Sequence, residues 1–125
     1  MGIKDTFAKK QVTCVAEVVN EDREIVGLHM TATSGERFIL TDWTDWTLRV
    51  DTRGDDELPD YFWPPEGHSL NVVFKSQDGA VVTSVQEQVD EMGEVIGLQL
   101  SIENFGILSA RADVEGFSWA RAVYP

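Results

Sequence analysis

The chain is poor in the residues on which disulfide formation and most acid–base catalysis depend. It has one cysteine, Cys14, and two histidines, His29 and His68, among 125 residues. A single cysteine cannot form a disulfide within the chain, and this favours a reducing compartment. No apolar run approaches the ~18 residues that a membrane span requires. Residues 1–11 lack the apolar core of a signal peptide, so the sequence predicts a cytoplasmic protein.

Basic residues are also scarce. Ten lysines and arginines stand against 22 aspartates and glutamates, which gives a net charge of −12. Nucleic acids and anionic membranes are bound through basic patches, so neither is an expected partner. An acidic protein attracts basic surfaces over long range, and the expected partner is therefore a basic protein. A chain of this length is expected to form one domain over residues 1–125.

The sequence lacks the motifs that carry catalysis or bind cofactors. There is no phosphate-binding glycine loop, nucleophile elbow or metal-ligand spacing. Four acids lie close together in the middle of the chain without the alternating pattern of a calcium loop: Asp55, Asp56, Glu57 and Asp60. The sequence therefore predicts a protein that is not an enzyme and that binds no cofactor or metal.

The most informative feature that is present is an internal repeat. Residues 12–30 (VTCVAEVVNEDREIVGLHM) align without a gap to residues 82–100 (VTSVQEQVDEMGEVIGLQL), at a constant offset of 70. Nine of these 19 positions are identical, whereas chance would give roughly one or two. We interpret the alignment as an internal duplication. The two copies are each too short for a core of their own, so we expect them to share one.

Both copies show the two-residue period of a strand with one buried face. The apolar side of the period comprises Val26, Leu28, Met30, Ile96, Leu98, Leu100 and Ile102. Glycine-containing turns at 34–35 and 104–106 predict hairpins, with return strands at 37–41 and 107–112 and further strands at 47–51 and 118–123. Residues 12–19 and 82–89 leave two readings, because their β-branched content predicts a strand while apolar positions 12, 15 and 19 have helical spacing. We expect strands there.

These elements predict a mainly β fold of two tandem antiparallel β-meander repeats. The first repeat covers residues 12–51 and the second residues 82–123, with a short strand expected at 69–74. We expect pseudo-twofold symmetry and packing as one sandwich or partly closed barrel. An acidic, aromatic and proline-rich insert, residues 52–67 (TRGDDELPDYFWPPEG), separates the repeats and is present only once.

Each candidate functional residue within the repeat can be compared with the residue that aligns with it in the other copy. Beyond the glycine turn we expect the offset to shift to 71. An apolar residue of the other copy then aligns with each of three tryptophans, so core or hairpin packing is favoured over ligand binding for Trp43, Trp46 and Trp119. His29 is expected on the polar face of its strand and aligns with Gln99, which cannot do acid–base work. Cys14 aligns with Ser84, which favours a small packed side chain over an activated thiol.

The insert has no second copy, so this comparison does not argue against a function for its residues. Its three consecutive aromatics cannot all face a core, and long irregular loops on a rigid sheet commonly carry function. We therefore predict that partner-binding residues lie here: Asp55, Asp56, Glu57, Asp60, Tyr61, Phe62 and Trp63. The alternative is that the insert folds back as a lid over the core. Both roles are compatible if one aromatic points inward and another outward.

In its short length, strong acidity and repeated hairpin (EVIGLQLSIENFG and EIVGLHMTATSG), the chain resembles small immunity proteins of bacterial polymorphic and contact-dependent toxin systems. Such families share no diagnostic motif, so no residue roles are carried over. The resemblance implies a cytoplasmic inhibitor that neutralises a basic toxin, typically a nuclease. Negative clusters would steer association with the basic cleft of such a toxin.

Two other classes of function fit the sequence. A small-ligand or carbohydrate-binding β module would stack its ligand on tryptophans, namely Trp43, Trp46 and Trp63. A structural or accessory domain, or the subunit of a homo-oligomer, would pair through an edge strand.

Overall fold

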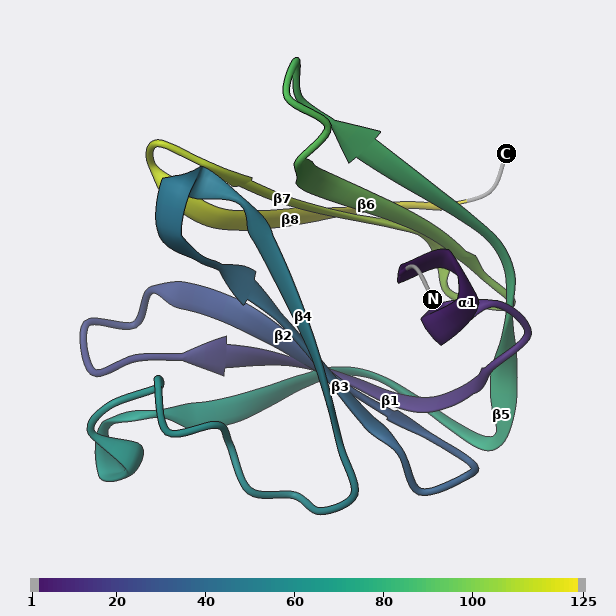
Figure 1. Ribbon diagram of the computed structural model, residues 1–125. Helices are drawn as coiled ribbons and strands as arrows, with labels where there is room; N and C mark the ends of the chain where they lie inside the picture. The colour runs from purple at the N-terminus through teal and green to yellow at the C-terminus, as the bar shows by residue number, and fades with distance from the viewer. Residues whose placement is uncertain (1–2, 124–125) are drawn as a thin grey trace.

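One antiparallel β-sheet makes up most of the computed structural model, which describes residues 3–123 without the side chain of Asp45 (Figure 1). The elements in chain order are α1 (Ile3–Phe7), β1 (Gln11–Val19), β2 (Ile25–Ala32), β3 (Arg37–Asp42), η1 (Thr44–Trp46), β4 (Leu48–Arg53), η2 (Pro65–Gly67), β5 (Ser69–Val89), β6 (Val95–Ile102), β7 (Gly106–Asp113) and β8 (Gly116–Ala122). Residues 1, 2, 124 and 125, at the ends of the predicted domain, lie outside the described residues. The prediction of a mainly β fold is confirmed.

The strand order is β4-β3-β2-β1-β5-β6-β7-β8. The 21-residue strand β5 pairs with β1 through its first part and with β6 through its second. The sheet is thereby folded into two layers, β1–β4 and β6–β8, with β5 running from one to the other (Figure 1). The layers face each other, since β2 contacts β8 and β3 contacts β7. The sheet is not closed, which makes the fold an open sandwich with β4 and β8 as its edges.

The strand ladders of the two layers have matching registers. Val15 lies opposite Met30 in the β1–β2 ladder, and Val85 lies opposite Leu100 in the β5–β6 ladder. All seven aligned pairs of these two ladders differ by 70, and β-bulges interrupt both at corresponding places. The offset of 70 persists into β3 and β7, where Phe38 and Leu108 occupy corresponding positions, so the expected shift to 71 beyond the turn is wrong for these strands. The duplication itself remains our interpretation of the sequence.

The bulges explain the helical spacing of apolar residues in the first strand of each copy. A bulge between Val12 and Cys14 adds one residue, so Val12 and Val15 both face the interior and are fully buried. The strand prediction for residues 12–19 and 82–89 is confirmed. At the second bulge Val18 and Val19 pair with Gly27 and Ile25, so Val26 is the extra residue in β2. Val26 packs against a separate cluster on the outer face. The prediction that Val26 belongs to the main core is therefore wrong.

The main core lies between the two layers. Five of the seven predicted core residues are buried in it: Leu28, Met30, Leu98, Leu100 and Ile102. Ile96 is half-buried and lies outside this cluster. Helix α1, which the sequence analysis did not predict, adds the fully buried Phe7, whose ring centre lies 5.0 Å from that of Phe38. Main-chain hydrogen bonds between Lys9, Lys10 and Val82 fix the segment that follows α1.

A second, smaller cluster lies on the outer face of the β1–β4 layer. It joins the sheet residues Val18 and Ile39 to Phe62 of the insert. The corresponding outer face of the other layer is polar and exposed, with Gln86 and Gln99 paired across β5 and β6. The insert thus covers the layer whose outer face is apolar, and no segment within residues 3–123 covers the polar one. The insert stabilises the fold because it removes that apolar face from water.

Candidate partner-binding site

The insert is an irregular segment, residues 54–68, that runs from the end of β4 to the start of β5. It begins two residues later than predicted, because Thr52 and Arg53 belong to β4. Local hydrogen bonds order it: Asp55 accepts the N–H of Glu57 at 3.1 Å, and Pro59 accepts the N–H of Phe62 at 3.0 Å. The segment is therefore a shaped loop held against the sheet.

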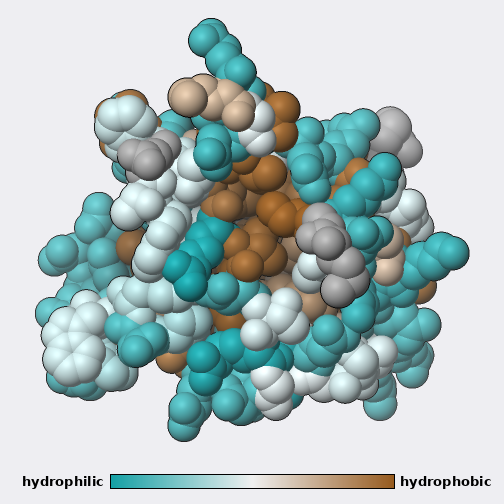
Figure 2. Space-filling view, in the orientation of Figure 1, coloured by the Kyte–Doolittle hydropathy of each residue, from teal (hydrophilic) through white to brown (hydrophobic). Residues whose placement is uncertain are grey.

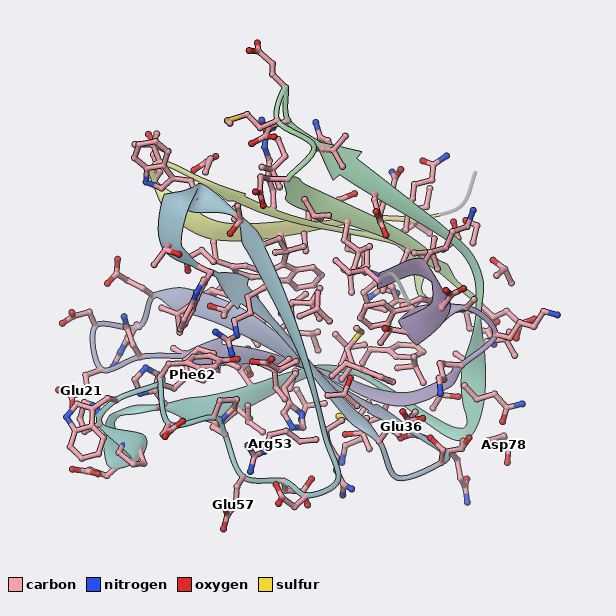
Figure 3. All side chains as sticks on the ribbon, viewed as in Figure 1. Glu21, Glu36, Arg53, Glu57, Phe62 and Asp78 are labelled. Atoms are coloured by element: carbon pink, nitrogen blue, oxygen red, sulfur yellow. The ribbon has the colours of Figure 1, made fainter. Side chains whose placement is uncertain are left out.

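The three consecutive aromatics of the insert occupy three environments. Phe62 is 5% exposed and Trp63 is 75% exposed, while Tyr61 is half-buried. Figure 3 shows Phe62 pointing to the sheet. Gly27 lies beneath its ring, and a Cβ there would stand 3.3 Å from the Phe62 ring and 2.6 Å from the Leu40 carbonyl oxygen. Phe62, predicted as a partner contact, is thus an anchor, and Trp63 is the aromatic that solvent reaches.

Tyr61 fixes the insert to strand β4. Its hydroxyl donates a hydrogen bond to the carboxylate of Asp51, which also accepts one from Arg49 Nε at 2.9 Å. The Arg49 guanidinium lies 4.0 Å from the centre of the Trp43 ring and 4.9 Å from that of Tyr61. Burial and the neighbouring Asp51 carboxylate raise the pKa of Tyr61 far above its ordinary value of 10. The hydroxyl therefore stays protonated and acts as a hydrogen-bond donor.

The predicted acids of the insert differ in how far cations compensate them. Asp55 pairs with Arg53 at 3.1 Å, and Asp56 pairs with Arg37 at 2.8 Å. The hydrogen bond from Arg53 lowers the pKa of Asp55, so this carboxylate is charged at neutral pH. Glu57 and Asp60 are exposed and form no ion pair with any described side chain.

The outward placement of these charges can be followed in the figures. Figure 3 shows Glu57 pointing away from the sheet, with Arg53, the last residue of β4, nearby. Hydrophilic residues cover most of the face seen in Figure 2, and hydrophobic residues gather in its middle, between the two layers. The insert thus presents negative charge to solvent.

The tryptophans outside the insert fall into two groups. Trp43 and Trp46 are 40% and 59% exposed, so neither belongs to the core, although Trp43 packs against Arg49 of the same hairpin and against Tyr61. Trp46 ends the short helix η1, and Trp43 directly precedes that helix. Trp119 does pack against the core, and its indole N–H donates to Glu17 at 2.9 Å.

His29 is buried, contrary to the expectation of a solvent-facing polar position. It is 3% exposed, and its Nε2 has no hydrogen-bond partner in the structure. Its ladder partners are Ala16 and Ile39, on the outer face that the insert covers. Burial lowers the pKa of His29, while Asp56 opposes this shift and Arg37 reinforces it. The two-residue period gave the correct face for His29 but could not show that another segment covers it.

The remaining candidates for chemistry show no activated group. Cys14 is half-buried, and burial raises the pKa of its thiol above the ordinary value, which disfavours the reactive thiolate. Residues 3–123 contain no group of three or more histidine, cysteine or acidic side chains arranged to hold a metal ion. No helix in this part of the chain is long and apolar enough to cross a membrane.

A pocket of about 230 Å³ lies where the insert meets the turn between β1 and β2. Its walls are Asn20, Glu21, Asp22, Trp63, Pro64, Gly67 and His68. Only Trp63 among these residues was predicted as part of a site. Residues 20–22 read as an ordinary hairpin turn, and nothing in their sequence places them beside residue 63.

A second pocket, of about 430 Å³, lies on the polar outer face of the other layer. Side chains at its rim include Gln86, Gln88, Gln99, Ser109 and Arg111. It has no aromatic residue among its lining residues.

Comparison of the chain with protein-family models, with curated proteins and with solved structures finds no match. The interpretation of the site therefore depends on its own chemistry: an anchored loop with four exposed carboxylates and the exposed indole of Trp63.

Proposed function

We propose that this is a non-enzymatic binding protein that takes a basic protein as its partner, with the insert as its contact surface. The observation that carries the proposal is that different side chains of the insert hold it on the sheet and face solvent. Phe62 holds the loop on the sheet, whereas Glu57, Asp60 and Trp63 face solvent. Protein interfaces commonly combine aromatic contact residues at the centre with polar residues at the rim.

The charge of the whole molecule supports the same partner class. A net charge of −12 produces a field that accelerates association with a basic surface. The insert concentrates part of that charge on a loop of defined shape, so a partner would meet it with little loss of conformational entropy.

The resemblance to bacterial immunity proteins narrows the proposal to one kind of basic partner. We propose that the partner is a toxin domain, typically a nuclease, whose cleft attracts phosphate. Carboxylates held on a rigid loop would occupy such a cleft in place of the substrate's charge.

The proposal is tested by comparing two variants of equal net charge. In the first, the insert is neutralised by Asp55→Asn, Asp56→Asn and Glu57→Gln. In the second, three exposed acids of the other layer's turns are neutralised by Glu91→Gln, Glu94→Gln and Glu115→Gln. Each change raises the net charge from −12 to −9. Tagged proteins are used at low salt to capture partners from a lysate of the native host.

We expect the wild type and the second variant to retain the same basic protein, and the insert variant to lose it. Elution of that protein by salt would agree with charge-dependent binding. An acidic captured protein, or one that the two variants retain equally, would contradict the proposal.

A second candidate function has one observation in its favour. Trp43, Trp46 and Trp63 are all exposed, which a carbohydrate-binding module would require. Trp43, however, already contacts Arg49 and Tyr61. Quenching of tryptophan fluorescence by a panel of oligosaccharides would support this candidate, and an unchanged spectrum would exclude it for the sugars tested.

A further inference from the structure

We propose that the pocket between Trp63 and the β1–β2 turn receives a lysine or arginine side chain of the basic partner. This inference rests on the proposed function, because it assigns a specific socket within the same contact surface. Three observations carry it: how Trp63 is held, what lies opposite the indole, and a matching arrangement elsewhere in the molecule.

Trp63 projects into solvent from a fixed base. Phe62, on one side, is buried in the outer cluster, and Pro64, on the other, accepts hydrogen bonds from the N–H of Gly67 at 3.0 Å and from His68 Nδ1 at 2.8 Å. The indole is nevertheless 75% exposed. A large aromatic side chain held rigidly in solvent gains contact area on binding at little entropic cost.

The wall opposite the indole is acidic and ordered. The side chain of Asn20 accepts the N–H groups of Asp22 and Glu24, both at 2.9 Å, and so closes the turn. Glu21 lies directly against Gly67, where an added Cβ would stand 2.3 Å from its Oε1. Figure 3 shows Glu21 at the same end of the molecule as η2. Neither Glu21 nor Asp22 forms an ion pair with a described side chain.

Elsewhere in the molecule, a cation lies between an aromatic ring and a carboxylate. Arg49 lies over the Trp43 ring and pairs with the Asp51 carboxylate at 2.9 Å. The pocket supplies the same aromatic and carboxylate groups in Trp63 and Glu21, and neither lysine nor arginine is among its lining residues. Arg23, on the same turn, is exposed and does not line it. An external ammonium or guanidinium would complete the set, whereas an anion would be repelled.

The chain offers a matched control for this site. Glu91 occupies the position in the β5–β6 turn that corresponds to Glu21, and Asp90 closes that turn through the same pair of hydrogen bonds at 2.9 Å. A separate pocket lies at the β5–β6 turn. Its lining residues, Val89–Met92, include no aromatic side chain. Glu21→Gln and Glu91→Gln therefore remove the same charge from similar turns, but only the first changes the proposed socket.

The experiment titrates the protein with an acetylated, amidated Gly-Arg-Gly peptide and follows the indole N–H signals by NMR. Loss of one signal in Trp63→Phe assigns the Trp63 resonance. The same peptide with citrulline in place of arginine is the neutral control. We expect the Trp63 signal to shift and saturate with the arginine peptide only. Glu21→Gln should weaken binding by about threefold, as one exposed cation contact implies, and Glu91→Gln should leave it unchanged.

Gly67→Ala tests the geometry of the socket without removing charge. The added methyl group would displace Glu21, whose flexible side chain can move aside, so the fold should persist while peptide binding weakens. The proposal is overturned if the Trp63 signal does not move, if the citrulline peptide binds as well, or if Glu91→Gln weakens binding as much as Glu21→Gln. The proposed function is tested separately, because the two variants used for partner capture leave every lining residue of this pocket unchanged.

Discussion

Single side chains of this protein divide by burial into those that hold the sheet and those that face solvent. Leu28 and Leu98 lie between the layers at corresponding positions and are 0% and 2% exposed. Leu70, on the outside of β5, is 42% exposed. The same residue type thus has different energetic weight in one sheet, because only the interior leucines leave a cavity when they are shortened.

Leu28→Ala or Leu98→Ala should lower the free energy of unfolding by about 2–5 kcal/mol. Leu70→Ala, the matched control, should change it by about 0.5 kcal/mol or less. Urea denaturation followed by circular dichroism measures all three. Midpoints for Leu28→Ala and Leu98→Ala that match the wild type would contradict the assignment of the core.

His29 should make the protein less stable as the pH falls. Its pKa is lowered in the folded state, so between the ordinary value of 6.5 and that lower value the unfolded chain binds the extra proton. Stability is therefore complete above about pH 6.5 and declines below it. His29→Gln, which places the residue type of Gln99 at this position, should remove this decline.

His68→Gln should retain the pH dependence, which makes it the control for the second histidine. Thermal unfolding between pH 5.5 and pH 8 compares the three proteins. A wild type whose stability relative to His29→Gln does not change over this range would refute the role given to His29.

At high pH, Tyr61 should make the protein less stable as the pH rises. Its folded pKa is raised, so above pH 10 the unfolded chain loses the phenolic proton while the folded protein keeps it, and stability falls. Tyr61→Phe should cost about 0.5–1.5 kcal/mol at neutral pH through the lost hydrogen bond to Asp51. It should also lack this contribution to the loss of stability between pH 10 and pH 11, as equilibrium denaturation at each pH would show.

At the scale of elements, the insert explains why the outer faces of the two layers differ. Ile39 and its counterpart Ser109 occupy corresponding ladder positions, as do Val18 and Gln88. The layer with apolar residues at these positions is covered, and the layer with polar residues is not. The insert is therefore part of the fold as well as the proposed contact surface, and the two roles belong to different side chains.

Phe62→Ala and Trp63→Ala should separate these two roles. Phe62→Ala removes the buried anchor and should cost about 3–5 kcal/mol, with faster hydrogen exchange concentrated in residues 54–68. Trp63→Ala should change stability by about 0.5 kcal/mol or less but weaken partner binding. If Trp63→Ala opened the insert as much as Phe62→Ala does, the division between anchor and contact would be wrong.

Strand positions could be predicted from the sequence because the two-residue period and the turn residues are local signals. The placement of Val26 could not, since Val26 is the extra residue of a β-bulge in β2 and so departs from the two-residue period. The pocket escaped prediction for a different reason. It brings Glu21 beside Gly67 and Trp63, which are more than 40 positions away in the chain. No pattern within either segment records that contact.

At the scale of the whole molecule, the side chains that we propose for partner recognition lie on one layer of the folded sheet. The two layers supply a shared core and matched ladders, while the exposed acids and the indole of the insert lie on one layer only. We infer that the repeat provides the scaffold and that the single insert provides recognition.

The most direct test of this account is the salt dependence of the association rate between the protein and its captured partner. We predict that neutralising Asp55, Asp56 and Glu57 lowers the rate by about tenfold at low salt and flattens its salt dependence. Neutralising Glu91, Glu94 and Glu115 should leave both close to wild type. Equal effects of the two charge-matched variants would show that only total charge matters, and would contradict the assignment of recognition to the insert.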